Sequence, residues 1–191
     1  MPSASRPASD RRTVLAGGAA GLLLFTLGGC DKLMTAREAR EQGADFRNLT
    51  AQETRTLEAF GEVLVPGATE AGIAHFVDAN LVRPHADCLL TIRYLDVPPP
   101  YGAFYAAGLK ALDDLARASA GKGFADLDGA GAADLVRPML AGQMSGWNGP
   151  PAPLLYLAVR SDAADLVYGT PDAFERLGLP YVAHIEPPTT W

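Results

Sequence analysis

Hydrophobic and polar positions alternate with a helical period from residue 49 onward. Thr50 and Glu53 have the spacing of a capping box, in which each side chain accepts a hydrogen bond from the other residue's backbone N–H. Apolar side chains then recur every three or four residues; they are Leu57, Phe60, Leu64 and Val65. This pattern predicts a helix that begins after Thr50 and is stopped by Pro66-Gly67.

The same period predicts further helices along the chain. One begins near Glu70, and Pro84 either breaks it or opens another helix. A longer helix ends near Gly121, Asp128 can cap the next, and residues 154–167 form the last. The apolar positions of these helices are Ile73, Phe76, Val77 and Leu81; Leu89, Leu90, Ile92 and Leu95; Phe104, Tyr105, Leu112 and Leu115; and Leu135, Val136, Met139 and Leu140.

Proline and glycine separate these segments, at residues 98–100 and 146–153 and in the tail from Tyr168. The sequence shows no hairpin signal, strict alternation or internal repeat. It therefore predicts an all-α fold: a single compact helical domain over residues 49–191 with an irregular Gly/Pro-rich C-terminal segment.

The first 29 residues have the pattern of a signal peptide. Arg11 and Arg12 precede an apolar run, Ala16 to Leu27, that is too short to cross a bilayer core, which needs about 20 apolar residues. With Leu15, the arginine pair resembles the twin-arginine export signal. The alternative is an ordinary export signal that happens to contain two arginines.

The end of this run, residues 27–30, resembles a lipobox, the cleavage site of a bacterial lipoprotein. Cys30 would supply the thiol for the thioether to diacylglycerol, and Asp31 resembles a signal for retention at the inner membrane. The alternative is a chance cysteine beside a small-residue cleavage site. Residues 30–48 are charged and lack a sustained apolar face, which predicts a lipid tether, with at most one short helical turn, between the 1–29 signal and the domain.

Composition narrows the function. The chain of 191 residues carries a net charge of −6 and has no basic cluster, which argues against a nucleic-acid partner. Its two cysteines, Cys30 and Cys88, cannot build a disulfide framework if Cys30 is acylated. Cys88 lies in an apolar run and is expected to be buried.

Motifs of catalysis and cofactor binding are missing from the sequence: it has no dinucleotide fingerprint, P-loop, nucleophile elbow or haem-attachment motif. His184 and Glu186 could bind a metal with a distant histidine, and the pairs Asp113-Asp114 and Asp126/Asp128 could suggest a cation site. Packing, surface and capping roles account for these residues better, because no two histidines have i, i+4 spacing and the acidic pairs do not supply the six or more oxygens that calcium needs. We therefore predict no catalytic, cofactor-binding or metal-binding residue in this chain.

Aromatic residues outside the helical pattern remain to be explained. Trp147 and Trp191 lie in or after Pro/Gly-rich segments, and Tyr168 precedes a glycine that can end a helix. Exposed tryptophans often anchor interfaces, so these three residues form the predicted partner interface. The alternative is that they plug the ends of the helical core.

Three segments, in order, resemble the small subunit (gamma, or subunit 3) of gluconate 2-dehydrogenase and related sugar dehydrogenases. They span residues 49–81, 108–128 and 166–188, and read LTAQETRTLEAFGEVLVPGATEAGIAHFVDANL, GLKALDDLARASAGKGFADLD and LVYGTPDAFERLGLPYVAHIEPP. The similarity covers most of the chain after residue 48 and is weakest around residues 146–160.

The resemblance implies a helical accessory subunit with no cofactor of its own. Its partners would be a large FAD-containing subunit of the glucose-methanol-choline type and a cytochrome c subunit with haem c. Its signal would take the folded flavoprotein through the twin-arginine export machinery to the periplasmic face of the inner membrane. The rival interpretations are a free-standing periplasmic lipoprotein that binds a ligand or envelope partner, and a small metalloenzyme using His184 and Glu186.

Overall fold

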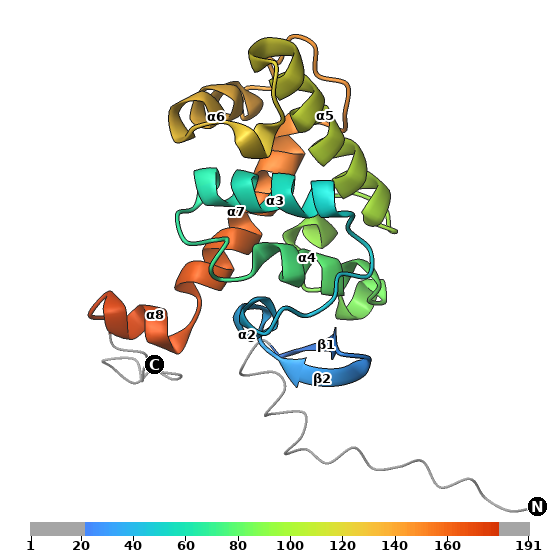
Figure 1. Cartoon of the computed structure of the whole chain (residues 1–191), viewed down its shortest axis with the longest axis vertical. Coiled ribbons are helices and arrows are strands. Elements are labelled where there is room, and N and C mark those ends of the chain that lie inside the picture. Colours follow the sequence, from blue (N-terminus) through green and yellow to red (C-terminus); the bar gives the residue numbers. More distant parts are fainter. Residues whose placement is uncertain (1–21, 180–191) are drawn as a thin grey trace, which may run out of the picture.

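A computed structural model describes residues 22–179, and this part of the chain is mostly helical (Figure 1). The α-helices are α2 (Ala36–Glu41), α3 (Ala51–Leu64), α4 (Ile73–Leu81), α5 (Gly102–Ala120), α6 (Gly129–Val136), α7 (Ala152–Tyr168) and α8 (Pro171–Arg176). Short 3₁₀ turns are η1 (His85–Asp87), η2 (Thr91–Tyr94), η3 (Phe124–Asp126) and η4 (Arg137–Met139). Two strands, β1 (Leu23–Leu27) and β2 (Cys30–Met34), complete the described fold.

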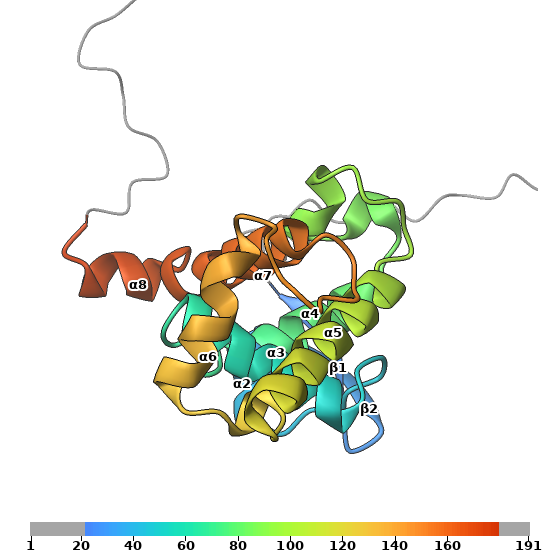
Figure 2. The same ribbon diagram turned by 90° about the horizontal axis from the view of Figure 1, so that it is seen from above.

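Helix α3 is the centre of the fold. It packs against α4, α5, α6 and α7, with α5 and α6 on one side and α4 on the other (Figures 1 and 2). Leu57 and Phe60 on its apolar face are fully buried, and the Phe60 ring meets the edge of Phe124 from η3 at 6.1 Å. Burying such side chains from water stabilises the fold.

Local signals predicted most helix ends correctly. The capping box of α3 is present in both directions between Thr50 and Glu53, and Asp128 caps α6 by accepting from the Gly131 N–H at 2.8 Å. The helix expected from Glu70 begins at Ile73 instead. Gly72 lies in the left-handed region at φ 85°, so the helical backbone cannot extend back through it.

Residues 84–97 differ from the helix that the apolar pattern allowed as one alternative after Pro84. They form η1 and η2, joined by extended backbone at Cys88 and Leu90. Arg93 holds the segment by donating from Nη1 to the backbone carbonyls of Ala86 and Cys88, each at 3.0 Å. The tail also contains a helix that was not expected, α8, capped by the Thr170 side chain.

The prediction that the chain has no hairpin was wrong. β1 and β2 pair antiparallel, from Leu23 opposite Met34 to Leu27 opposite Cys30. The connecting Gly28 and Gly29 have φ of 57° and 82°, the left-handed conformation of a two-residue hairpin turn. The same two glycines also suit the small-residue end of an export signal, so their sequence alone does not distinguish a cleavage site from a turn.

Residues 30–48, expected to be a tether, are folded against the domain. They contain β2 and α2, and α2 packs on α4. A second small core forms there, separate from the main one; its buried residues are Leu23, Phe25, Met34, Ala36, Ala39 and Ala44. The apolar residues of this segment are few, but they meet the side of α4 that the main core leaves uncovered, which the local pattern does not reveal.

Candidate partner-binding groove

The predicted export and lipidation residues lie at or beyond the start of the described chain. Arg11, Arg12 and Leu15 are outside the described residues. Cys30 is exposed at the start of β2, and Asp31 follows it. The Asp31 carboxylate accepts from the Thr26 hydroxyl at 2.7 Å and pairs with Arg47; these contacts, the Thr26 bond first, lower its pKa.

The predicted interface residues are not brought together. Trp147 is half-buried against the main core, and its indole N–H donates to the Pro150 carbonyl at 2.7 Å. Tyr168 is exposed at the end of α7. Helix α7 lies between them in the chain; its 17 residues span about 25 Å at 1.5 Å of rise per residue, and Tyr168 is at its far end from Trp147. Trp191 lies outside the described residues.

An open groove with a volume of about 460 Å³ lies between the start of α3 and one face of α5. Its lining residues are Thr50, Gln52, Glu53, Thr56, Ala103, Ala106, Ala107, Leu109, Lys110 and Asp113. A second hollow of about 330 Å³ continues it toward Leu81 and Pro100, and the two share Glu53, Ala103 and Ala106. We call this continuous surface the α3–α5 groove.

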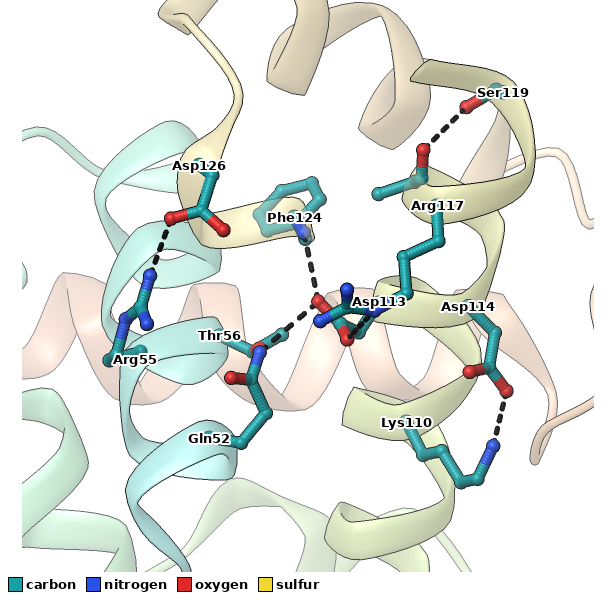
Figure 3. Close-up of polar contacts among 11 residues, drawn as sticks. Gln52, Arg55, Thr56, Lys110, Asp113, Asp114, Arg117, Ser119, Phe124 and Asp126 are labelled. Atoms are coloured by element: carbon teal, nitrogen blue, oxygen red, sulfur yellow. Dashed lines mark hydrogen bonds and ion pairs between the residues drawn. The ribbon is translucent and has the colours of Figure 1, made fainter. Parts of the chain in front are cut away.

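One end of the α3–α5 groove is polar (Figure 3). There Asp113 of α5, almost buried, accepts from the backbone N–H of Phe124 at 2.9 Å, from Nε2 of Gln52 at 3.2 Å and from Nε of Arg117 at 2.9 Å. Lys110 pairs with Asp114 one helical turn along α5. Each of these charged side chains has a partner inside the chain, so the polar groups at this end of the groove are already satisfied without a ligand.

The two carboxylates Glu53 and Asp113 that line the groove are already engaged within the chain. Glu53 is used by the α3 capping box, and Asp113 by the network just described. The alanines of α5 leave the helix backbone accessible, so another helix or loop can approach closely. Sequence reasoning missed this site, although Ala103, Ala106 and Ala107 recur at helical spacing; small residues alone are a weak signal.

Two buried aspartates that were not predicted as site residues hold distant segments together. Asp78 of α4 accepts from the backbone N–H groups of residues 47–49 at 2.8–3.0 Å. Asp162 of α7 accepts from the Thr91 N–H at 2.8 Å and from the Tyr105 hydroxyl at 3.3 Å. Burial raises the pKa of Asp162 to about 6 and raises that of Tyr105 as well. Aspartates are rarely buried unless they are paired, and Asp78 and Asp162 are both paired with groups of their own chain. We therefore assign both a structural role.

The residues weighed as metal ligands do not converge in the described chain. His75 is buried in the second core, where Nε2 contacts the Ala44 carbonyl at 3.2 Å and burial lowers its pKa. His85 contacts the Tyr101 hydroxyl. Between residues 22 and 179, no three His, Cys, Asp or Glu side chains are placed to share a metal ion. His184 and Glu186 lie outside the described residues.

Residues 22–179 form a helical domain with a small N-terminal hairpin. None of the helices between residues 22 and 179 is long and apolar enough to cross a membrane. The sequence model of the gluconate 2-dehydrogenase subunit 3 family matches residues 51–184, most of the chain, and the protein belongs to that family. A comparison with curated proteins finds no match, and neither does a comparison with solved structures.

Proposed function

We propose that this chain is a non-catalytic accessory subunit that escorts a folded FAD-containing dehydrogenase of the glucose-methanol-choline type through twin-arginine export. The observation that carries the proposal is the family match over residues 51–184, in a chain that also has the Arg11-Arg12 pair. A flavoprotein binds its cofactor as a folded protein, so it needs a route that exports folded chains. The signal of this chain directs the flavoprotein to that route. A cytochrome c subunit accepts the electrons.

The α3–α5 groove is the surface that we propose for the catalytic subunit. It is open, which suits a segment of another protein better than an enclosed small molecule. Its charged side chains already have hydrogen-bond or ion-pair partners within the chain, so a segment with small apolar side chains can bind without breaking these contacts. The complex acts at the periplasmic face of the inner membrane, and the escort role holds whichever way the chain is attached there.

The escort role is tested by comparing strains with and without this chain. Dehydrogenase activity toward an artificial electron acceptor is measured in the periplasmic membrane fraction, and flavin absorbance is measured on protein that co-purifies with the tagged chain. We expect activity and co-purified flavin only when the chain is present, with the catalytic subunit left in the cytoplasm of the deletion strain. Equal periplasmic activity in both strains, with no flavoprotein bound, would favour a free-standing lipoprotein.

The groove is tested by two matched substitutions on α5. Ala107→Glu places a carboxylate in the groove, whereas Ala118→Glu places the same group on the same helix beyond the groove. We expect Ala107→Glu to weaken binding of the catalytic subunit at least tenfold because an unpaired charge is buried at the interface. Ala118→Glu should bind as the wild type does, and circular dichroism checks that both remain helical.

If Ala107→Glu binds normally, the groove is not the interface. Tyr168→Ala then tests the predicted alternative surface at the end of α7, where the side chain is exposed and its loss leaves the core intact. Weaker binding in Tyr168→Ala alone would move the interface to that end of the molecule.

A further inference from the structure

Strand β1 is an integral part of the folded domain. Leu23 is 1% exposed and Phe25 is 4% exposed, so the two inward-facing side chains of the strand are as buried as the main core. The backbone carbonyl of Thr26 accepts from the Asp45 N–H at 3.0 Å, a contact outside the hairpin itself. The strand is therefore held by its partner strand, by the turn after α2 and by the second core.

The contacts of Phe25 show what the strand covers. Its ring meets His75 of α4 edge-on at 6.2 Å, and Phe46 also packs on the His75 ring, at 4.3 Å. Removal of residues 22–29 would open one side of this cluster to water and leave β2 without its only described partner strand.

The lipobox interpretation places a cut between Gly29 and Cys30, within this hairpin. Gly28 and Gly29 both have positive φ, which the two-residue turn of the hairpin requires. The glycine pair thus has a structural reason to be present that does not involve a peptidase. The same four residues, 27–30, serve either as an extended substrate for cleavage or as the end of a closed hairpin.

We propose that residues 23–29 stay in the exported protein, that any cleavage of the signal precedes Leu23, and that Cys30 is a free surface thiol at the hairpin tip. This replaces the acylated N-terminus expected from the sequence. It rests on the proposed function only in taking the chain as exported, since an escort works with either N-terminus.

The first test is the covalent state of the protein purified from cells that express the full chain. We expect intact mass and N-terminal analysis to place the first residue at or before Leu23. A maleimide should add once without denaturant, at Cys30. Cys88 is fully buried and burial raises the pKa of its thiol, so it should react only after unfolding. A mature protein that begins at a diacylglyceryl Cys30 would overturn the proposal.

The second test uses the thermal midpoint of the purified exported protein. Phe25→Ala should lower the midpoint by roughly 10 °C because it leaves a cavity in the second core. Leu24→Ala, on the half-exposed outer face of the same strand, should change it by no more than about 2 °C. Phe25→Leu is the milder variant, with a smaller drop, in case Phe25→Ala does not accumulate.

These variants separate the two outcomes cleanly. If the chain is cut between Gly29 and Cys30, residues 24 and 25 are removed. Wild type, Leu24→Ala and Phe25→Leu then yield the same mature protein, and their midpoints must be identical. Identical midpoints would refute the proposal. Neither readout measures dehydrogenase activity, so failure of the escort role and failure of this inference are distinguishable.

Discussion

At the scale of single residues, buried carboxylates decide how loops are fixed to helices. Asp162 reaches from α7 to the N–H of Thr91, 71 positions earlier, and to the hydroxyl of Tyr105 on α5. Each contact satisfies a polar group that would otherwise be buried without a partner. Burying the Asp162 carboxylate in an apolar setting lowers the stability of its ionised form, and this burial is the main cause of its raised pKa.

Asp162→Asn should stabilise the protein at neutral pH. The folded-state pKa of about 6 exceeds the unfolded value of about 3.9, so the folded state binds this proton more tightly. The ionised form therefore costs stability above pH 6, and the Asp162 contribution to the free energy of unfolding rises as the pH falls from 6 to 4. Asparagine keeps an oxygen for the Thr91 N–H and has no charge. We expect a gain of up to about 3 kcal/mol at pH 7.5.

Urea unfolding of wild type and Asp162→Asn at several pH values measures this effect. His75 acts in the opposite direction over part of the same range: burial lowers its pKa, so protonation as the pH falls favours unfolding. The difference between the two proteins cancels the His75 contribution. A difference that does not shrink between pH 7 and pH 4 would contradict the assignment to Asp162.

At the scale of elements, the junction between α2 and α4 depends on one close backbone approach. Gly72, the N-cap residue of α4, has φ 85°, and a Cβ atom there would lie 2.2 Å from the backbone oxygen of Ala36 in α2. This contact brings α2 close enough to α4 for the second core to form between them. The position thus requires both a left-handed conformation and the absence of a side chain.

Gly72→Ala should therefore destabilise the protein more than conformational strain alone explains. Gly121→Ala is the matched control, because Gly121 has φ 71° but a Cβ atom at that position would have no neighbouring atom within 4 Å. We expect about 1–2 kcal/mol for Gly121→Ala from strain and a clearly larger loss for Gly72→Ala, measured by urea unfolding. Equal losses would mean that α2 moves away from α4 at little cost.

At the scale of the whole molecule, we expect the N-terminal segment to determine the export route and the domain to determine what is exported with it. Changing Arg11 and Arg12 together to Lys keeps the charge but should block export, because the twin-arginine pathway discriminates against lysine at this pair. Arg6→Lys, outside the pair, should be exported normally. Cell fractionation with antibodies to this chain and to the catalytic subunit measures both proteins, and undiminished export of the double variant would exclude a twin-arginine signal.

The sequence by itself determined the features that depend on neighbours a few residues away. The sequence predicted the capping box and the apolar face of α3, because helix signals lie within one or two turns. It also predicted the family. The Gly28-Gly29 turn was also a local signal, but tertiary structure decided that β1 packs on α4. It alone decided two other features: residues 84–97 are held by Asp162 from far along the chain, and the α3–α5 groove is made by helices separated in sequence. Long-range contacts fix these features, and no local pattern encodes where such partners will lie.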